Sequence, residues 1–147
     1  MKPDYLYHGS QYLFEVLMPN QAKDNTSIGS QLAIYACEDF NLAIPFALPI
    51  RWYPDDPTGK RSFSCSNGKV LIEYGYINPN GFGYVYKISS KDFEKIDNRQ
   101  WVSAKETQIL EVTKISVADY WHNISFTDIA LEINKRLYPS ETLYLGL

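Results

Sequence analysis

The sequence predicts an α+β domain that is dominated by β-structure, and three observations support this prediction. Apolar and aromatic runs of strand length recur along the 147 residues, and turn-forming segments rich in glycine, proline, asparagine and serine separate them. Apolar side chains at helical spacing occur in only two segments. Aromatic residues, including 12 tyrosines, make up 15% of the chain, and their rings suit strands, cores and stacking clefts. Strands that are joined irregularly, with few helices, are typical of this class.

The N-terminal part of the chain predicts two strands. Residues 5–7 form a short aromatic and aliphatic run that ends in the tripeptide His-Gly-Ser at residues 8–10. Such a strand delivers its last side chain to a sheet edge or a cleft. A polar, turn-rich segment over residues 20–30 separates it from the apolar run at residues 32–37, which is the second strand. The chain has only two histidines, so an imidazole at a strand end marks a candidate site.

A short helix is predicted directly after the second strand. Glu38 and Asp39 are acids at its expected N-terminus, where they interact favourably with the helix dipole. Pro45 lies inside the helical pattern, removes a backbone donor and crowds the preceding turn. We therefore expect this helix to be kinked or to end early. The apolar residues that carry the helical spacing are Phe40, Ala43, Ile44 and Ala47.

The middle of the chain predicts a long loop followed by two strands. Residues 51–68 contain prolines, glycines and serines at the density of a loop. A loop of this length is either a functional lid or a tolerated surface insertion. Apolar runs follow at residues 70–74 and 84–88, and a turn segment at residues 78–81 joins them.

The C-terminal part of the chain predicts a long strand and a second helix. Residues 107–115 are a clear strand candidate, residues 92–96 are expected to form a short helical turn, and residues 143–145 allow one last strand. Ser125 and Asp128 have capping-box spacing at the start of the helix. The apolar stripe of this helix, which indicates core packing, comprises Phe126, Ile129, Ala130, Ile133 and Leu137.

Length and composition predict a single domain over residues 1–147. A chain of this length buries about 70% of its unfolded surface, so it needs no disulfide or metal to stabilise its core. The net charge of −3 provides no basic field that would attract nucleic acid or anionic lipid. Cys37 and Cys65 are far apart in the sequence, as are the two histidines, so no sequence-local metal motif exists. We therefore expect no metal.

The N-terminal residues predict a cytoplasmic protein without a membrane partner. Residues 1–4 lead straight into the first strand, and no long apolar stretch that would form a signal peptide or a membrane span is visible. Export by a route that needs no such signal stays open, and with it an effector or toxin-like role.

Three of these segments, taken together, resemble the His-Tyr-Glu branch of the ADP-ribosyltransferase fold. Diphtheria-toxin-like enzymes and poly(ADP-ribose) polymerases share this fold, and the NAD-using RNA 2′-phosphotransferases share it more loosely. His8 and Gly9 resemble the family's His-Gly pair at the end of the first strand, and Tyr35 resembles its first tyrosine. The family has a second tyrosine eleven positions later, where this chain has Phe46. Glu106, before the late strand, resembles the family's carboxylate.

The resemblance covers roughly residues 5–117 and implies a split β-sandwich of two sheets with an NAD cleft between them. It implies that the chain uses NAD as a co-substrate and either transfers ADP-ribose to an acceptor or hydrolyses NAD. The acceptor, whether a protein, a nucleic acid or a small molecule, is not visible in the sequence, and the loop after residue 50 is where its contacts are expected. The arginine-type branch of the fold is disfavoured, because its Arg…Ser-Thr-Ser…Glu-x-Glu pattern is missing.

The resemblance also implies a role for each matched residue. Glu106 would be catalytic, because a carboxylate beside the nicotinamide ribose stabilises an oxocarbenium-like transition state. The two aromatic rings would stack on the nicotinamide, although Phe46 lacks the hydroxyl of the family's tyrosine. In the first strand, the imidazole would hydrogen-bond the adenosine ribose, the glycine backbone would contact the nicotinamide, and the serine would assist. The residues that would bind NAD are His8, Gly9, Ser10, Tyr35 and Phe46.

Four alternatives stay open at the level of the sequence. Glu111 lies in the same late strand as the predicted catalytic position and competes with it. The chain could instead be a catalytically inactive module that binds a nucleotide or a protein on the same fold. Cys37 and His8 could form a thiol hydrolase pair. Transfer of an RNA phosphate would need a basic cluster, for which the local candidates are Arg51, Lys60 and Arg61.

Overall fold

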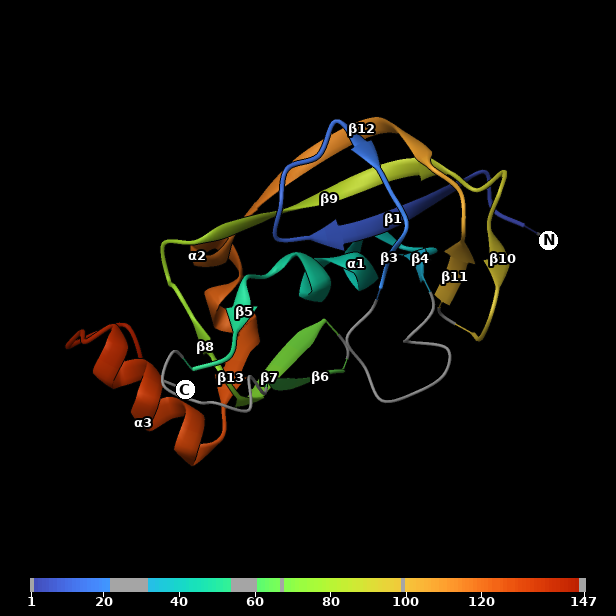
Figure 1. Cartoon of the computed structure of the whole chain (residues 1–147). Helices are drawn as coiled ribbons and strands as arrows, with labels where there is room; N and C mark the ends of the chain where they lie inside the picture. Colours follow the sequence, from blue (N-terminus) through green and yellow to red (C-terminus); the bar gives the residue numbers. More distant parts are fainter. Residues whose placement is uncertain (1, 22–31, 54–60, 67, 99, 146–147) are drawn as a thin grey trace.

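The computed structural model describes residues 2–21, 32–53, 61–66, 68–98 and 100–145 (Figure 1). It has a mixed α+β architecture with a large antiparallel sheet and few helices, as the sequence predicts. No helix in these ranges is long and apolar enough to cross a membrane. The helices are α1 (Phe40–Ala47), α2 (Val117–Tyr120), the 3-10 helix η1 (Trp121–Asn123) and α3 (Asp128–Leu137).

The large sheet contains eight strands and is antiparallel throughout. Along its main path the order is β10-β11-β4-β1-β9-β12-β2, and β3 pairs with β4 off this path. Its strands are β1 (Tyr5–Ser10), β2 (Val16–Leu17), β3 (Asn20–Gln21), β4 (Leu32–Cys37), β9 (Phe82–Ser89), β10 (Glu94–Lys95), β11 (Gln100–Ser103) and β12 (Thr107–Ser116).

The segment between β1 and β3 crosses one face of the large sheet. Because β2 pairs with β12 and β3 pairs with β4, this segment passes over β9 and β1 (Figure 1). The Tyr86 hydroxyl fixes it, since it donates to the carbonyl oxygen of Tyr12 at 2.6 Å and accepts from the amide of Phe14 at 2.8 Å. The buried core on this side of the sheet comprises Leu6, Leu17, Ile34, Ala36, Tyr86, Ile88, Phe93 and Trp101.

The opposite face of the large sheet packs against α1, which lies between it and a smaller sheet (Figure 1). The smaller sheet has the order β13-β7-β6, and a separate pair of strands, β5 and β8, lies beside it. These strands are β5 (Ile50–Arg51), β6 (Ser62–Ser66), β7 (Lys69–Tyr74), β8 (Tyr76–Ile77) and β13 (Ile124–Phe126). The second buried core therefore joins α1 to both sheets, through residues such as Ala43, Ala47, Val85 and Ile72.

Two glycines allow the backbone of α1 to lie directly on the large sheet. A Cβ atom on Gly9 of β1 would be 2.2 Å from the carbonyl oxygen of Ala43, and one on Gly83 of β9 would be 1.7 Å from that of Ala47. Both distances are far below van der Waals contact, so only glycine fits at these positions without a shift of the helix.

The observed helix bounds correct part of the sequence prediction. Of the two outcomes expected at Pro45, an early end does not occur, because α1 continues to Ala47 with Asp39 as its N-cap. A proline at this position removes one backbone donor from the helix, and its side chain is buried. In α3 the N-cap is Thr127, whose hydroxyl accepts from the amide of Ala130, whereas Ser125 belongs to β13, where pairing with β7 takes precedence over the capping box.

Three predictions about strands and turns are also wrong. Residues 92–96 form no helical turn, because Glu94–Lys95 pairs with β11 as β10. Residues 51–68 are not one loop, because Ser62–Ser66 pairs with β7 as β6; residues 54–60 and 67 lie outside the described residues. Residues 143–145 form a turn rather than a strand, in which the amide of Leu145 donates to the carbonyl oxygen of Thr142.

Candidate functional site

A small cavity opens where β1 and β4 separate beside the end of α1, and we call it the inner cavity. Within the described residues, the ladder between β1 and β4 consists of the pair Tyr7 and Cys37. The two strands part beyond this pair, towards Gly9 and Tyr35. The cavity has a volume of about 160 Å³ and is lined by Tyr7, His8, Gly9, Tyr35, Ala36, Cys37, Phe46 and Gln100.

His8 occupies the gap between the separating strands. Its Nδ1 atom lies 2.6 Å from the carbonyl oxygen of Tyr35. A carbonyl can only accept, so Nδ1 carries the proton and Nε2 is left as an acceptor in the neutral ring. Burial lowers the pKa of His8 from its ordinary value, an effect that the bond to Tyr35 opposes in part. The imidazole is thus held neutral, with one acceptor atom that can take a hydrogen bond from a hydroxyl group.

The residues after His8 in β1 have mainly structural contacts. Gly9 lines the inner cavity, and its backbone packs closely against the backbone of α1. Ser10 is not among the described residues that line the inner cavity. Its hydroxyl accepts from the amide of Tyr12 at 3.1 Å and so stabilises the turn that leads into the crossing segment.

Tyr35 and Phe46 line the inner cavity from two different elements. Tyr35 is half-buried in β4, whereas Phe46 is on the last turn of α1 and is 47% exposed. The exposed part of the ring leaves a face open to a planar ligand. The Phe63 ring of β6, whose centroid lies 6.2 Å away at an interplanar angle of 66°, supports Phe46 from the side.

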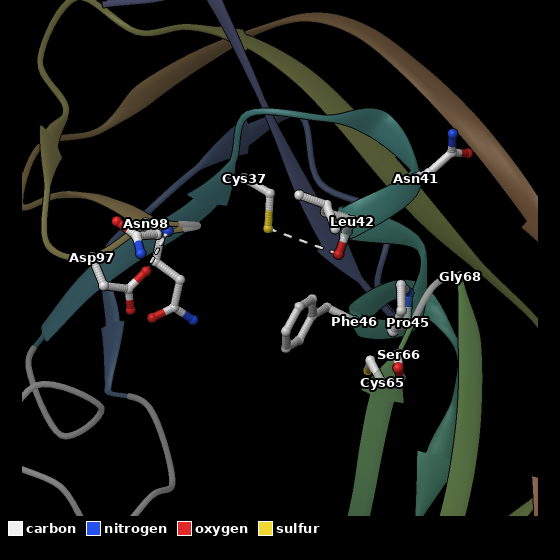
Figure 2. Close-up of a pocket in the computed structure, with 11 residues that line it drawn as sticks. Cys37, Asn41, Leu42, Pro45, Phe46, Cys65, Ser66, Gly68, Asp97 and Asn98 are labelled. Carbon is white, nitrogen blue, oxygen red and sulfur yellow. Dashed lines mark hydrogen bonds between the residues drawn. The ribbon is translucent and has the colours of Figure 1, made fainter.

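A larger depression adjoins the inner cavity, and we call it the outer groove. It has a volume of about 610 Å³ and shares Cys37, Phe46 and Gln100 with the inner cavity. Figure 2 shows the Phe46 ring facing the open space, with Asp97 and Asn98 on the far side and Cys65 of β6 below. The remaining described residues that line the groove are Asn41, Leu42, Pro45, Ser66 and Gly68.

Glu106 lies apart from these lining residues, in the turn between β11 and β12. Its side chain is exposed and is not among the described residues that line the inner cavity or the outer groove. The hydroxyl of Ser103 accepts from the amide of Lys105 at 3.1 Å, and that of Thr107 donates to the carbonyl oxygen of Lys105 at 3.2 Å. Glu111, the competing carboxylate, is exposed on β12, where it pairs with Lys87 of β9.

The thiol of Cys37 is placed in the inner cavity but is not activated. Burial raises its pKa to about 11, and the nearby Asp97 carboxylate adds to this effect. The thiol also lies 3.8 Å from the carbonyl oxygen of Leu42, to which it donates. At neutral pH only about one thiol in 10⁴ would be ionised with such a pKa. The geometry therefore gives no support to a hydrolase that uses Cys37 and His8.

The structure brings four of the five predicted NAD-binding residues to one cavity and adds others that the sequence did not indicate. Tyr7 and Gln100 line the inner cavity, and Asp97 and Asn98 line the outer groove. Tyr7 directly precedes the His-Gly pair in β1, whereas the pairing of β11 with β4 brings Gln100 beside Cys37. The described residues contain no group of three or more His, Cys, Asp or Glu side chains that could hold a metal ion.

Comparisons with known proteins do not identify a family for this chain. No family model matches it, and no match was found among the curated proteins or among the solved structures. The interpretation of the site therefore depends on the geometry above and on the motif resemblance.

Proposed function

We propose that this protein is an NAD-dependent enzyme on an ADP-ribosyltransferase-like split β-sandwich. It transfers ADP-ribose from NAD to an acceptor, or to water as an NAD glycohydrolase. The observation that carries the proposal is that His8, Gly9, Tyr35 and Phe46 line one cavity although they come from β1, β4 and α1. These residues were identified from the motif in the sequence alone, so the finding that they line one cavity is independent support for the proposal.

The inner cavity suits the nicotinamide end of NAD. Its rings, Tyr35 and Phe46, offer flat apolar faces to a planar heterocycle. The Nε2 acceptor of His8 can take a hydrogen bond from a hydroxyl of the adenosine ribose, and this contact requires no change of protonation. The outer groove, which adjoins the inner cavity at Phe46, provides space for an acceptor to approach the nicotinamide ribose.

Glu106 is the proposed catalytic carboxylate, and it lies in the turn that follows β11, the strand next to β4. Ser103, at the end of β11, pairs with Ile34, the residue next to Tyr35 in β4. Three residues of chain span at most about 10 Å, so the Cα atom of Glu106 lies within that distance of the Cα atom of Ser103. A carboxylate here would stabilise positive charge on the ribose as the bond from C1′ to the pyridinium nitrogen breaks, and nicotinamide would leave with the bonding electrons.

Nicotinamide release from NAD by the purified protein tests this proposal. We expect turnover by the wild type, and a loss of about 100-fold or more in Glu106→Gln, because the variant retains the shape but not the charge of the carboxylate. Calorimetric binding of NAD should be largely spared in this variant. Glu111→Gln is the matched control and should keep full turnover. Full activity in Glu106→Gln would overturn this assignment, and loss confined to Glu111→Gln would transfer the role to Glu111.

A second candidate function is a nucleotide-binding module without catalysis on the same fold. The observation that favours it is the exposure of Glu106 outside the described lining of both depressions. This alternative predicts saturable binding of NAD or ADP-ribose and no release of nicotinamide, so the same two measurements distinguish it from the enzyme.

A further inference from the structure

Gln100 occupies the junction between the inner cavity and the outer groove. Among the described residues, it is one of three that line both, together with Cys37 and Phe46. Of the three, Phe46 has no polar side-chain atom and the Cys37 thiol is directed to the carbonyl oxygen of Leu42. The side-chain amide of Gln100 is therefore the group at this junction that can both donate and accept hydrogen bonds to a ligand.

The register of β11 orients Gln100 towards the site. Gln100 is directly opposite Cys37 in β4, and its neighbour Trp101 is opposite Ala36. Opposed residues in an antiparallel pair share a face, and successive residues alternate. Trp101 and Ala36 are both in the core on the covered face of the sheet, so Gln100 and Cys37 face α1 and the cavity.

The backbone of Gln100 is held in place while its side chain stays available. Its backbone amide donates to the Asp97 carboxylate at 2.8 Å. Its carbonyl oxygen accepts from the amide of Ile96 at 3.0 Å. The side-chain amide is half-buried and makes no hydrogen bond to another described residue. A fixed backbone with a side-chain amide at a cavity wall is the arrangement that a recognition residue requires.

We propose that Gln100 is the residue that selects the carboxamide of nicotinamide. A primary amide can form two hydrogen bonds with another primary amide, donating from nitrogen and accepting at oxygen. A carboxylate in place of the carboxamide accepts only, which would leave the Gln100 oxygen facing a negative charge. The rings of Tyr35 and Phe46 in the same cavity offer flat faces to the planar group that this amide would bind. This inference rests on the proposed function for the identity of the ligand.

Binding of free nicotinamide, nicotinic acid and adenosine, followed by NMR titration, tests the proposal without requiring turnover. We expect the wild type to bind nicotinamide about tenfold or more tightly than nicotinic acid, because the acid cannot reproduce both hydrogen bonds. Gln100→Ala should reduce this preference to near unity. Gln108→Ala, which removes an exposed amide on β12, is the matched control and should keep the preference. Because the Gln100 side chain is not part of either core, both variants should fold.

Each outcome of this titration has one meaning. A wild type without the preference, or a preference that survives in Gln100→Ala, overturns the role of Gln100. Adenosine binding that depends on Gln100, with no such dependence for nicotinamide, overturns it as well and assigns the amide to the other base. A Gln100-dependent preference in a protein that releases no nicotinamide from NAD supports the recognition role and contradicts only the proposed enzymatic activity.

Discussion

Two regions of the molecule differ in how many core contacts they make. One is β1, which forms a wall of the inner cavity, and the other is the turn that carries Glu106. On the wall, Gly9 contacts the backbone of α1. Leu6, which is two residues before His8 and on the same face of β1, is fully buried. In the turn, the side chain of Glu106 is exposed, and hydroxyl groups rather than core contacts fix the backbone. Substitutions on the wall should therefore change stability and binding together, whereas the carboxylate can be altered almost independently of the fold.

Gly9→Ala should show the largest effect. The added Cβ would lie 2.2 Å from the carbonyl oxygen of Ala43 and 2.8 Å from the amide nitrogen of Ala47, so α1 must move away from β1. Overpacking of this kind costs about 3 kcal/mol in the free energy of unfolding. Urea denaturation measures it, and NAD binding should weaken in the same variant because the cavity wall shifts.

Two matched substitutions sharpen this comparison. Gly68→Ala introduces a Cβ atom that has no other atom within 4 Å, at a residue with φ of 78°. The free energy of unfolding should therefore fall by about 1 kcal/mol, because alanine adopts the left-handed conformation less readily than glycine. Glu106→Ala should change the free energy of unfolding by no more than about 0.5 kcal/mol. A Gly9→Ala protein as stable as the wild type would mean that α1 does not rest on β1 as described.

The strands that were predicted well from the sequence are those whose own residues form an apolar, β-rich run. The runs at 32–37, 84–88 and 107–115 are apolar and β-rich, and each is a strand of the large sheet. By contrast, Ser62–Ser66 is mostly exposed and has little apolar content, and it is a strand because β7 pairs with it. The pair Glu94–Lys95 likewise depends on β11. Partners from elsewhere in the chain decide such segments, so local periodicity could not reveal them.

The same distinction applies to the site. His8, Gly9, Tyr35 and Phe46 were found through motif spacing, which the chain displays within two short stretches. Gln100 had no such signal, since it reaches the cavity only through its register with Cys37. The position of Glu106 relative to the cavity also depends on non-local pairing, which is why the sequence could name this residue but not its exposure.

Tyr86→Phe tests whether the crossing segment stabilises the face of the sheet on which His8 lies. The Tyr86 hydroxyl bonds both Tyr12 and Phe14, and its loss leaves the Phe14 amide and the Tyr12 carbonyl without this partner. We expect the free energy of unfolding to fall by about 1 to 2 kcal/mol. Hydrogen exchange should show faster exchange at the Phe14 amide in particular. Unchanged exchange there would mean that the hydroxyl does not hold the segment.

The smallest expected effect is a pH dependence of stability that arises from His8. Burial lowers the pKa of His8 in the folded state, so below about pH 6.5 the unfolded chain binds more protons than the folded one. The contribution of His8 is therefore complete above that pH and is lost as the pH falls, until the folded imidazole also titrates. Urea denaturation between about pH 7 and about pH 5 should show a steeper loss in the wild type than in His8→Asn.

His122→Asn provides the control for this last comparison, because His122 is exposed on η1 while His8 fills the gap between β1 and β4. The 17 acidic residues contribute equally to all three proteins, so the difference between their slopes isolates the imidazole. Equal slopes in His8→Asn and the wild type would show that His8 is accessible to protons in the folded state, and would remove the argument that its Nε2 atom is a permanent acceptor for a ribose hydroxyl.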